Sequence, residues 1–168
     1  MISRGKREEI EVIIALTKAC GKYLREQGID QWDENYPDYE SIERDLSTQT
    51  LFTFREDKTI IGIVVLNETQ DEEYGDIDWI TEDGTRNLVV HRLAVLPDHQ
   101  GKGIARKLMD HAEVFAKEEG YDSIRLDTFS QNPRNQKFYQ NRGYSDLGPV
   151  YLKYKKSHPY YCYELLIN

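Results

Sequence analysis

The feature that most limits how this chain can fold is a glycine-bearing turn between a strand pattern and a helix pattern. The strand pattern covers residues 87–95, which are mostly β-branched or apolar, and the amphipathic helix pattern covers residues 104–119. Between them lies Gln100-Gly101-Lys102-Gly103-Ile104-Ala105. Glycines let the backbone approach an anion closely, and the first amides of a helix have no intrahelical acceptor. The turn therefore predicts a phosphate site, to which Lys102 adds a positive charge.

Two common nucleotide-binding turns fit this segment poorly. A Walker A loop needs Lys and then Ser or Thr after its last glycine, whereas Ile104 and Ala105 follow Gly103 here. A Rossmann turn lies near the start of repeated strand and helix units, and an acidic residue follows it about 20 residues later. This turn lies past the middle of the chain. The turn alone leaves the class of phosphate ligand open.

The spacing of the turn resembles the acyl-CoA pyrophosphate loop of the GNAT acetyltransferase superfamily. That loop has Gln or Arg, two residues, Gly, one residue, and then Gly or Ala, which Gln100, Gly103 and Ala105 match. Further along, Asn135-Gln136-Lys137-Phe138-Tyr139 and Arg142-Gly143-Tyr144 resemble the next block of the superfamily. The resemblance implies an acetyl-CoA-dependent N-acetyltransferase. It also implies that one continuous run of residues binds this cosubstrate: Gln100, Gly101, Lys102, Gly103, Ile104, Ala105 and Arg106.

Composition and charge are those of an ordinary globular protein. A chain of 168 residues predicts one domain, residues 1–168, and no apolar run approaches the ~20 residues of a membrane helix. The charged start, Met1 to Glu9, lacks the apolar stretch of a signal peptide, so we expect a cytoplasmic protein. Cys20 and Cys162 have no metal-binding spacing, and we expect no metal. The net charge of −8 argues against nucleic acid as a partner.

The order of the predicted elements indicates a mixed α/β sheet with helices on both faces. The GNAT resemblance adds that the sheet is mainly antiparallel and that its two central parallel strands splay apart to admit the pantetheine arm. The strand patterns cover residues 51–55, 59–66, 87–96, 123–128 and 160–167. The helix patterns run from Ile10 to a C-cap at Gly28, then after Pro37-Asp38, over 104–119 and over 135–141.

The resemblance also assigns roles to the strand before the turn and to the later block. The backbone of Leu93, Ala94 and Val95 would pair with the pantetheine amides, and one free amide would polarise the thioester carbonyl. Tyr139 is the expected acid, because a tyrosine hydroxyl can protonate the departing thiolate. Asn135, one helical turn before Tyr139, would bind the pantetheine or the ADP portion. The alternatives are packing for Tyr139 and helix capping for Asn135.

The sequence leaves open which group deprotonates the amine. His91 has the same side-chain parity as Leu93, and in the similar arylalkylamine acetyltransferases histidines on this strand assist deprotonation. The other candidates are Asp127, Glu34 and Asp78. A core position for His91 and a loop-anchoring role for Asp127 are the alternatives.

Aromatic and acidic residues in two loops predict a cationic amine as the acceptor. Aromatic faces with acids nearby suit an ammonium group. The expected substrate contacts are Trp32, Glu34, Asp78, Trp79 and Asp127, although Trp32 also fits a core position.

The favoured function is direct acetyl transfer to a primary amine of a small molecule. The alternatives are acetylation of a protein or peptide amine and an acyl-CoA sensor without turnover. The resemblance also implies homodimers.

Overall fold

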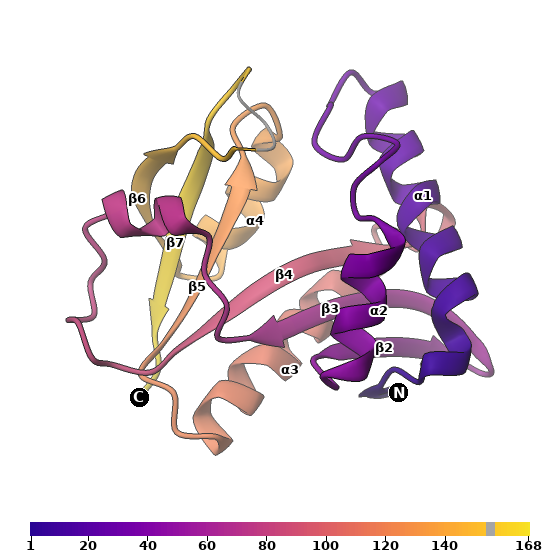
Figure 1. Ribbon diagram of the computed structural model, residues 1–168, viewed down its shortest axis with the longest axis horizontal. Helices are drawn as coiled ribbons and strands as arrows, with labels where there is room; N and C mark the ends of the chain where they lie inside the picture. Colours follow the sequence, from indigo (N-terminus) through magenta and orange to yellow (C-terminus); the bar gives the residue numbers. More distant parts are fainter. Residues whose placement is uncertain (154–156) are drawn as a thin grey trace. The chain divides into compact units, whose positions relative to one another are not determined.

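The computed structural model describes residues 1–153 and 157–168, which form a mixed α/β fold (Figure 1). Strand hydrogen bonding gives the order β1-β2-β3-β4-β5-β7-β6, with both parallel and antiparallel pairs. The chain forms two compact units, the first made of Met1–Leu66 and Val90–Ala112, the second of Asn67–Val89 and Glu113–Asn168. Strand β4 (Asn87–Val95) and helix α3 (Ile104–Glu118) each contribute residues to both units. The predicted fold class is confirmed.

The first unit consists of an antiparallel sheet whose two faces carry helices. Ile13 of one helix and Ile42 of another pack in the same core as Ile63, on one face of the third strand. Gly62 faces the other side, where an added Cβ would lie 3.1 Å from Leu108 of α3. The elements of this unit besides β4 and α3 are β1 (Ile2–Arg4), η1 (Arg7–Glu9), α1 (Ile10–Glu26), α2 (Tyr39–Ser47), β2 (Leu51–Glu56), β3 (Thr59–Asn67) and η3 (Pro97–His99).

The second unit is built on three further strands. Strand β7 (Tyr160–Leu166) pairs antiparallel with β5 (Ser123–Phe129) and with β6 (Ser145–Val150). The start of β4 pairs in parallel with the start of β5, where Leu88 lies opposite Ile124. Helix α4 (Pro133–Asn141) and the short 3-10 helix η2 (Glu72–Asp76) complete the unit.

Three elements differ from the sequence expectations. Strand β1 is too short to show a period, and β6 contains Gly148 and Pro149, which are depleted in strands, so neither was predicted. Helix α4 begins at Pro133 and not at Asn135, because Asn132 caps it and proline is well suited to the first helical position. Within residues 1–153 and 157–168, no helix has the length and apolar character needed to cross a membrane.

Candidate active site

The predicted phosphate turn leads directly into α3. Gly101 and Gly103 have φ angles of 77° and 80°, a left-handed conformation that glycine adopts without steric penalty. The guanidinium of Arg106 lies beside Gly103, since an added Cβ there would be 3.3 Å from Nη2. Lys102 and Arg106 are both exposed. Two left-handed glycines, the free amides of a helix start and two exposed cations make this turn suitable for a pyrophosphate.

A hydrogen bond from the Gln100 side chain connects the turn to the end of β4. Gln100 Nε2 donates to the Val95 carbonyl at 3.0 Å, and Cys20 Sγ donates to the same oxygen at 3.2 Å. The motif glutamine thus holds the strand and turn in their relative positions within the first unit. A pantetheine amide that bonded this carbonyl would share it with both side chains.

Arg92 interrupts the regular geometry of β4. Its φ of 49° lies in the left-handed region, which a non-glycine residue rarely adopts. His91, Arg92 and Leu93 are all half-buried, instead of alternating between the two faces of the sheet. The alternation of residues along the sequence therefore does not determine which face of the sheet the His91 side chain lies on. The role of His91 as a base stays a prediction.

A buried ion pair holds Arg92 in this conformation. Its Nε and Nη2 donate to the two carboxylate oxygens of Asp45 at 2.7 and 2.8 Å, and its Nη1 donates to the Tyr36 hydroxyl at 3.1 Å. The side chains of Arg92 and Asp45 are 11% and 3% exposed. Sequence reasoning missed this group. The sequence did contain one indication of a buried ion pair: the acidic residue Asp45 lies between Ile42 and Leu46 on the apolar face of α2.

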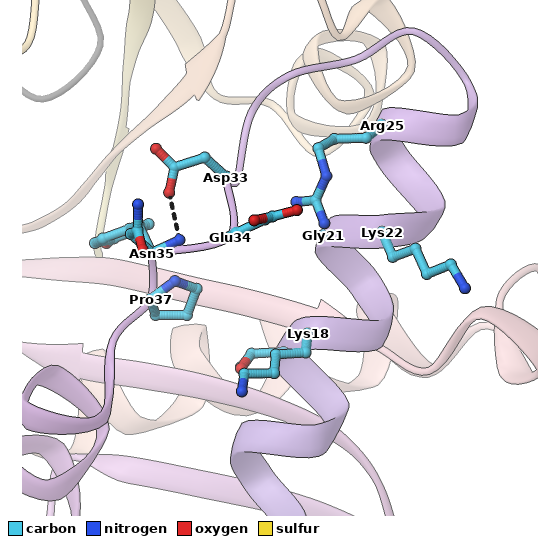
Figure 2. A pocket seen from close by; sticks show the side chains of 10 residues that line it. Lys18, Gly21, Lys22, Arg25, Asp33, Glu34, Asn35 and Pro37 are labelled. Carbon is cyan, nitrogen blue, oxygen red and sulfur yellow. Dashed lines mark hydrogen bonds between the residues drawn. The ribbon is translucent and has the colours of Figure 1, made fainter.

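A pocket of about 460 Å³ lies between α1 and the loop that follows it (Figure 2). The helix contributes three basic side chains and the loop two acidic ones, so the wall carries both signs of charge. Glu34 lines this pocket, and its role as a substrate contact stays a prediction, whereas Trp32 is 8% exposed and packs in the core. The lining residues are Thr17, Lys18, Gly21, Lys22, Arg25, Asp33, Glu34, Asn35, Tyr36 and Pro37.

In the second unit, Tyr139 is buried on α4. It is 5% exposed, and its ring packs against the rings of Phe138 and Tyr144, with centroids 5.1 and 5.8 Å away. Burial, with the nearby charge of Asp127, raises the pKa of Tyr139 far above its usual value. The hydroxyl therefore keeps its proton at neutral pH and can act as a donor.

Asn135 lies in the first turn of α4 and is half-buried. The helix cap is Asn132, whose side chain accepts a hydrogen bond from the Asn135 amide at 3.3 Å. The carboxamide of Asn135 makes no hydrogen bond to residues 1–153 or 157–168, so it can bind a ligand.

Asp127 lies on β5 and accepts a hydrogen bond from the Tyr74 hydroxyl. Tyr74 belongs to η2 and is 2% exposed. Burial raises the pKa of Asp127 to about 6, and the Tyr74 hydrogen bond opposes part of that rise. A carboxyl group with this pKa can exchange protons near neutral pH.

Trp79 contacts Tyr74 through a hydrogen bond and through its ring. Its Nε1 donates to the Tyr74 carbonyl at 2.8 Å, and the two rings lie 5.1 Å apart. The guanidinium of Arg125 lies 4.3 Å from the Trp79 ring. Asp78, by contrast, is exposed. The structure thus gathers Trp79, Asp127 and Tyr139 in the second unit, while Glu34, His91 and the turn belong to the first.

Within residues 1–153 and 157–168, no three His, Cys, Asp or Glu side chains lie close enough together to hold a metal ion.

Comparison with known proteins gives one consistent family. Residues 17–144 match the Acetyltransferase (GNAT) family. The uncharacterized N-acetyltransferase YesJ of Bacillus subtilis is 25% identical over 143 residues, which cover 84% of this chain and 79% of that protein. The L-amino acid N-acyltransferase MnaT of Escherichia coli is 37% identical over 67 residues, 40% of this chain and 39% of that protein.

One further relative and one solved structure also match this chain. The L-methionine sulfoximine/L-methionine sulfone acetyltransferase of Salmonella typhimurium is 29% identical over 110 residues, 61% of this chain and 63% of that protein. The crystal structure of a GNAT-family acetyltransferase from Streptococcus agalactiae superposes with a TM-score of 0.86 at 22% identity, covering 100% of this chain and 95% of that one. At this identity, the structural likeness concerns the fold.

Proposed function

Because this chain belongs to the GNAT acetyltransferase family and is an acetyl-CoA-dependent acyltransferase, we propose that it acetylates the primary amine of a small molecule. The observation that carries the proposal is the turn that begins at Gln100, where two left-handed glycines precede the free amides of α3. An anion bound there would meet backbone donors, the positive end of the helix dipole and two cations. Ile104 and Ala105 would contribute their backbone amides.

The roles within the first unit follow from the positions of the turn and of β4. The CoA pyrophosphate would lie on the amides of the turn, with Lys102 and Arg106 nearby. The backbone of Leu93 and Ala94 would bond the pantetheine arm, and one of their amides would stabilise the negative charge that develops on the thioester oxygen. The Arg92–Asp45 pair would hold this backbone in position.

In the second unit, Tyr139 is the proposed acid. A tyrosine hydroxyl carries its proton at neutral pH, so it can give that proton to the CoA sulfur as the carbon–sulfur bond breaks. Asn135, whose carboxamide is not used as a helix cap, would bond the pantetheine or the ADP portion.

We propose that the acceptor carries an anionic group beside its amine, as an amino acid does. Lys18 and Arg25 on the α1 side of the pocket (Figure 2) suit a carboxylate, and Glu34 on the loop suits an ammonium group. Two relatives bear names that specify an amino acid or an amino-acid analogue as substrate. This proposal differs from the cationic acceptor expected from the sequence, because basic residues of α1 line the same pocket as the acidic loop.

The test is a panel assay with acetyl-CoA that measures both CoA thiol release and the mass of the product. The panel contains amino acids, their amides, diamines and short peptides. We expect amino acids to react faster than the matching amides, which lack the carboxylate. Acetylation of peptides alone would support a peptide N-acetyltransferase, and CoA binding without thiol release for any amine would support a sensor. Either result would contradict the proposal.

A further inference from the structure

The hydrogen bond between Tyr74 and Asp127 uses only one oxygen of the carboxylate. The Tyr74 hydroxyl bonds Oδ2 of Asp127, and Oδ1 accepts no hydrogen bond from the described residues. Asp127 itself is only half-buried, while Tyr74 is 2% exposed. The phenol thus holds one oxygen of the carboxylate from the protein interior, and the other oxygen is not used in a hydrogen bond within residues 1–153 and 157–168.

The surroundings of Asp127 come from four parts of the second unit. Tyr74 belongs to η2, Asp71 immediately precedes η2, and Cys162 lies opposite Asp127 on β7. Tyr139 of α4 is near enough for the charge of Asp127 to raise its pKa. These neighbours are two phenols, a thiol and a carboxylate, and none of them is a cation that would keep Asp127 ionised.

We propose that Asp127 is the general base that deprotonates the acceptor amine, and that Tyr74 is its positioning residue. The inference rests on the proposed acetyl transfer to an amine. It places the base and the proposed acid, Tyr139, in one compact unit. It also gives a function to η2, which the family motifs do not include.

Asp127 takes one proton from the ammonium group, and the neutral nitrogen then bonds the acetyl carbon while the carbon–sulfur bond breaks. Tyr139 gives its hydroxyl proton to the sulfur and receives the second proton of the nitrogen in exchange. Asp127 then releases its proton to solvent, so that each turnover yields an amide, a CoA thiol and one proton.

This assignment predicts a specific pH profile. Asp127 acts only when ionised, and its pKa is about 6, so kcat/KM should rise as the pH increases through that value. The Tyr74 hydrogen bond lowers the pKa of Asp127. Tyr74→Phe should therefore move the rise to higher pH, and Asp127→Asn should abolish it.

The experiment compares the parent with Tyr74→Phe, Asp127→Asn and the double variant, using an aliphatic amine and a weakly basic arylamine. General-base catalysis contributes roughly 10²- to 10⁴-fold, so Asp127→Asn should lower kcat/KM for the aliphatic amine by at least ~10²-fold. The arylamine is already neutral at pH 7 and should lose far less. In the double variant, removal of the Tyr74 hydroxyl should cause no further loss, because it acts through Asp127.

Two matched controls separate catalysis from folding. Asp76→Asn changes an exposed acid of η2, and Tyr151→Phe removes an exposed hydroxyl of the same unit. Equal losses for both amines, or an unchanged pH profile in Asp127→Asn, would overturn the inference while leaving acetyl transfer intact. A parent enzyme that acetylates no amine at all would instead contradict the proposed function.

Discussion

Asp45 of α2 and Arg92 of β4 form a two-point ion pair, at 2.7 and 2.8 Å, that holds a left-handed residue inside a strand. Strained backbone of this kind persists only where the surroundings fix it. Breaking the pair by Asp45→Asn leaves Arg92 buried without its counter-ion, which typically lowers stability by about 3 to 5 kcal/mol. Urea unfolding measures this loss.

The control for this prediction is Glu43→Gln, on the same helix. Glu43 is 47% exposed and pairs with Arg7 at 3.4 Å, and exposed pairs contribute at most about 1 kcal/mol. A similar loss of stability in the two variants would mean that the buried pair has no special role.

Gly103 allows the charge at the turn to be tested separately from backbone strain. Its φ of 80° disfavours most side chains, but Asn and Asp both tolerate the left-handed region and have nearly the same shape. We expect Gly103→Asp to bind acetyl-CoA at least tenfold more weakly than Gly103→Asn, a difference of about 1.4 kcal/mol, because its carboxylate repels the pyrophosphate. Calorimetry on both folded variants measures the difference, and equal affinities would argue against a phosphate at this turn.

Tyr139→Phe removes the proposed acid and little volume. Turnover at saturating substrate should fall by roughly 10²-fold while the affinity for acetyl-CoA stays nearly constant. Steady-state kinetics with calorimetric binding provide the measurement, with Tyr151→Phe as the matched hydroxyl deletion at a site that is 62% exposed. Undiminished turnover would assign Tyr139 to packing alone.

The pocket beside α1 predicts which part of the substrate each charge recognises. Lys18→Gln removes one exposed cation, so kcat/KM for an amino acid should fall by roughly 2- to 5-fold, as expected for an exposed charge. The value for the corresponding amide should not change. Added salt should reduce the preference for the acid over the amide. Lys117→Gln, an exposed change on α3, is the control, and an equal response to both variants would place the carboxylate elsewhere.

The raised pKa of Asp127 should also make the stability of the protein depend on pH, and the direction of the pKa shift determines the sign of that dependence. The folded-state pKa of about 6 exceeds the unfolded value near 3.9, so the folded protein binds more protons between these pH values. The contribution of Asp127 to stability is therefore greatest below about pH 4 and decreases as the pH rises to about 6. Asp127→Asn removes this dependence, so the variant should gain stability relative to the parent across that window. Chemical unfolding at several pH values tests the sign.

The sequence predicted those parts of the fold that local patterns specify. The turn at Gln100 combines glycines with a following apolar helix period, and both are short-range features. The GNAT family and its acyltransferase activity, inferred from this turn and the later block, are confirmed. Strand β6 escaped prediction because Gly148 and Pro149 mask its pattern, although pairing with β7 stabilises it.

The remaining site features depend on contacts between distant segments. The residues next to Arg92 in the sequence do not indicate its left-handed conformation. That conformation is held by the carboxylate of Asp45, which lies on another element. Tyr74 lies in a loop of ordinary composition, and its importance arises from Asp127, 53 positions later. The expected single domain and the homodimer stay predictions.

The hydrogen bond from Gln100 to Val95 means that the turn is organised before any cofactor arrives. A loop that is already ordered loses little conformational entropy on binding, so more of the interaction energy is retained as affinity. Small fragments that carry only the pyrophosphate portion should then bind with an unusually high free energy per atom. In this chain the motif glutamine would thus strengthen cofactor binding by ordering the turn in advance.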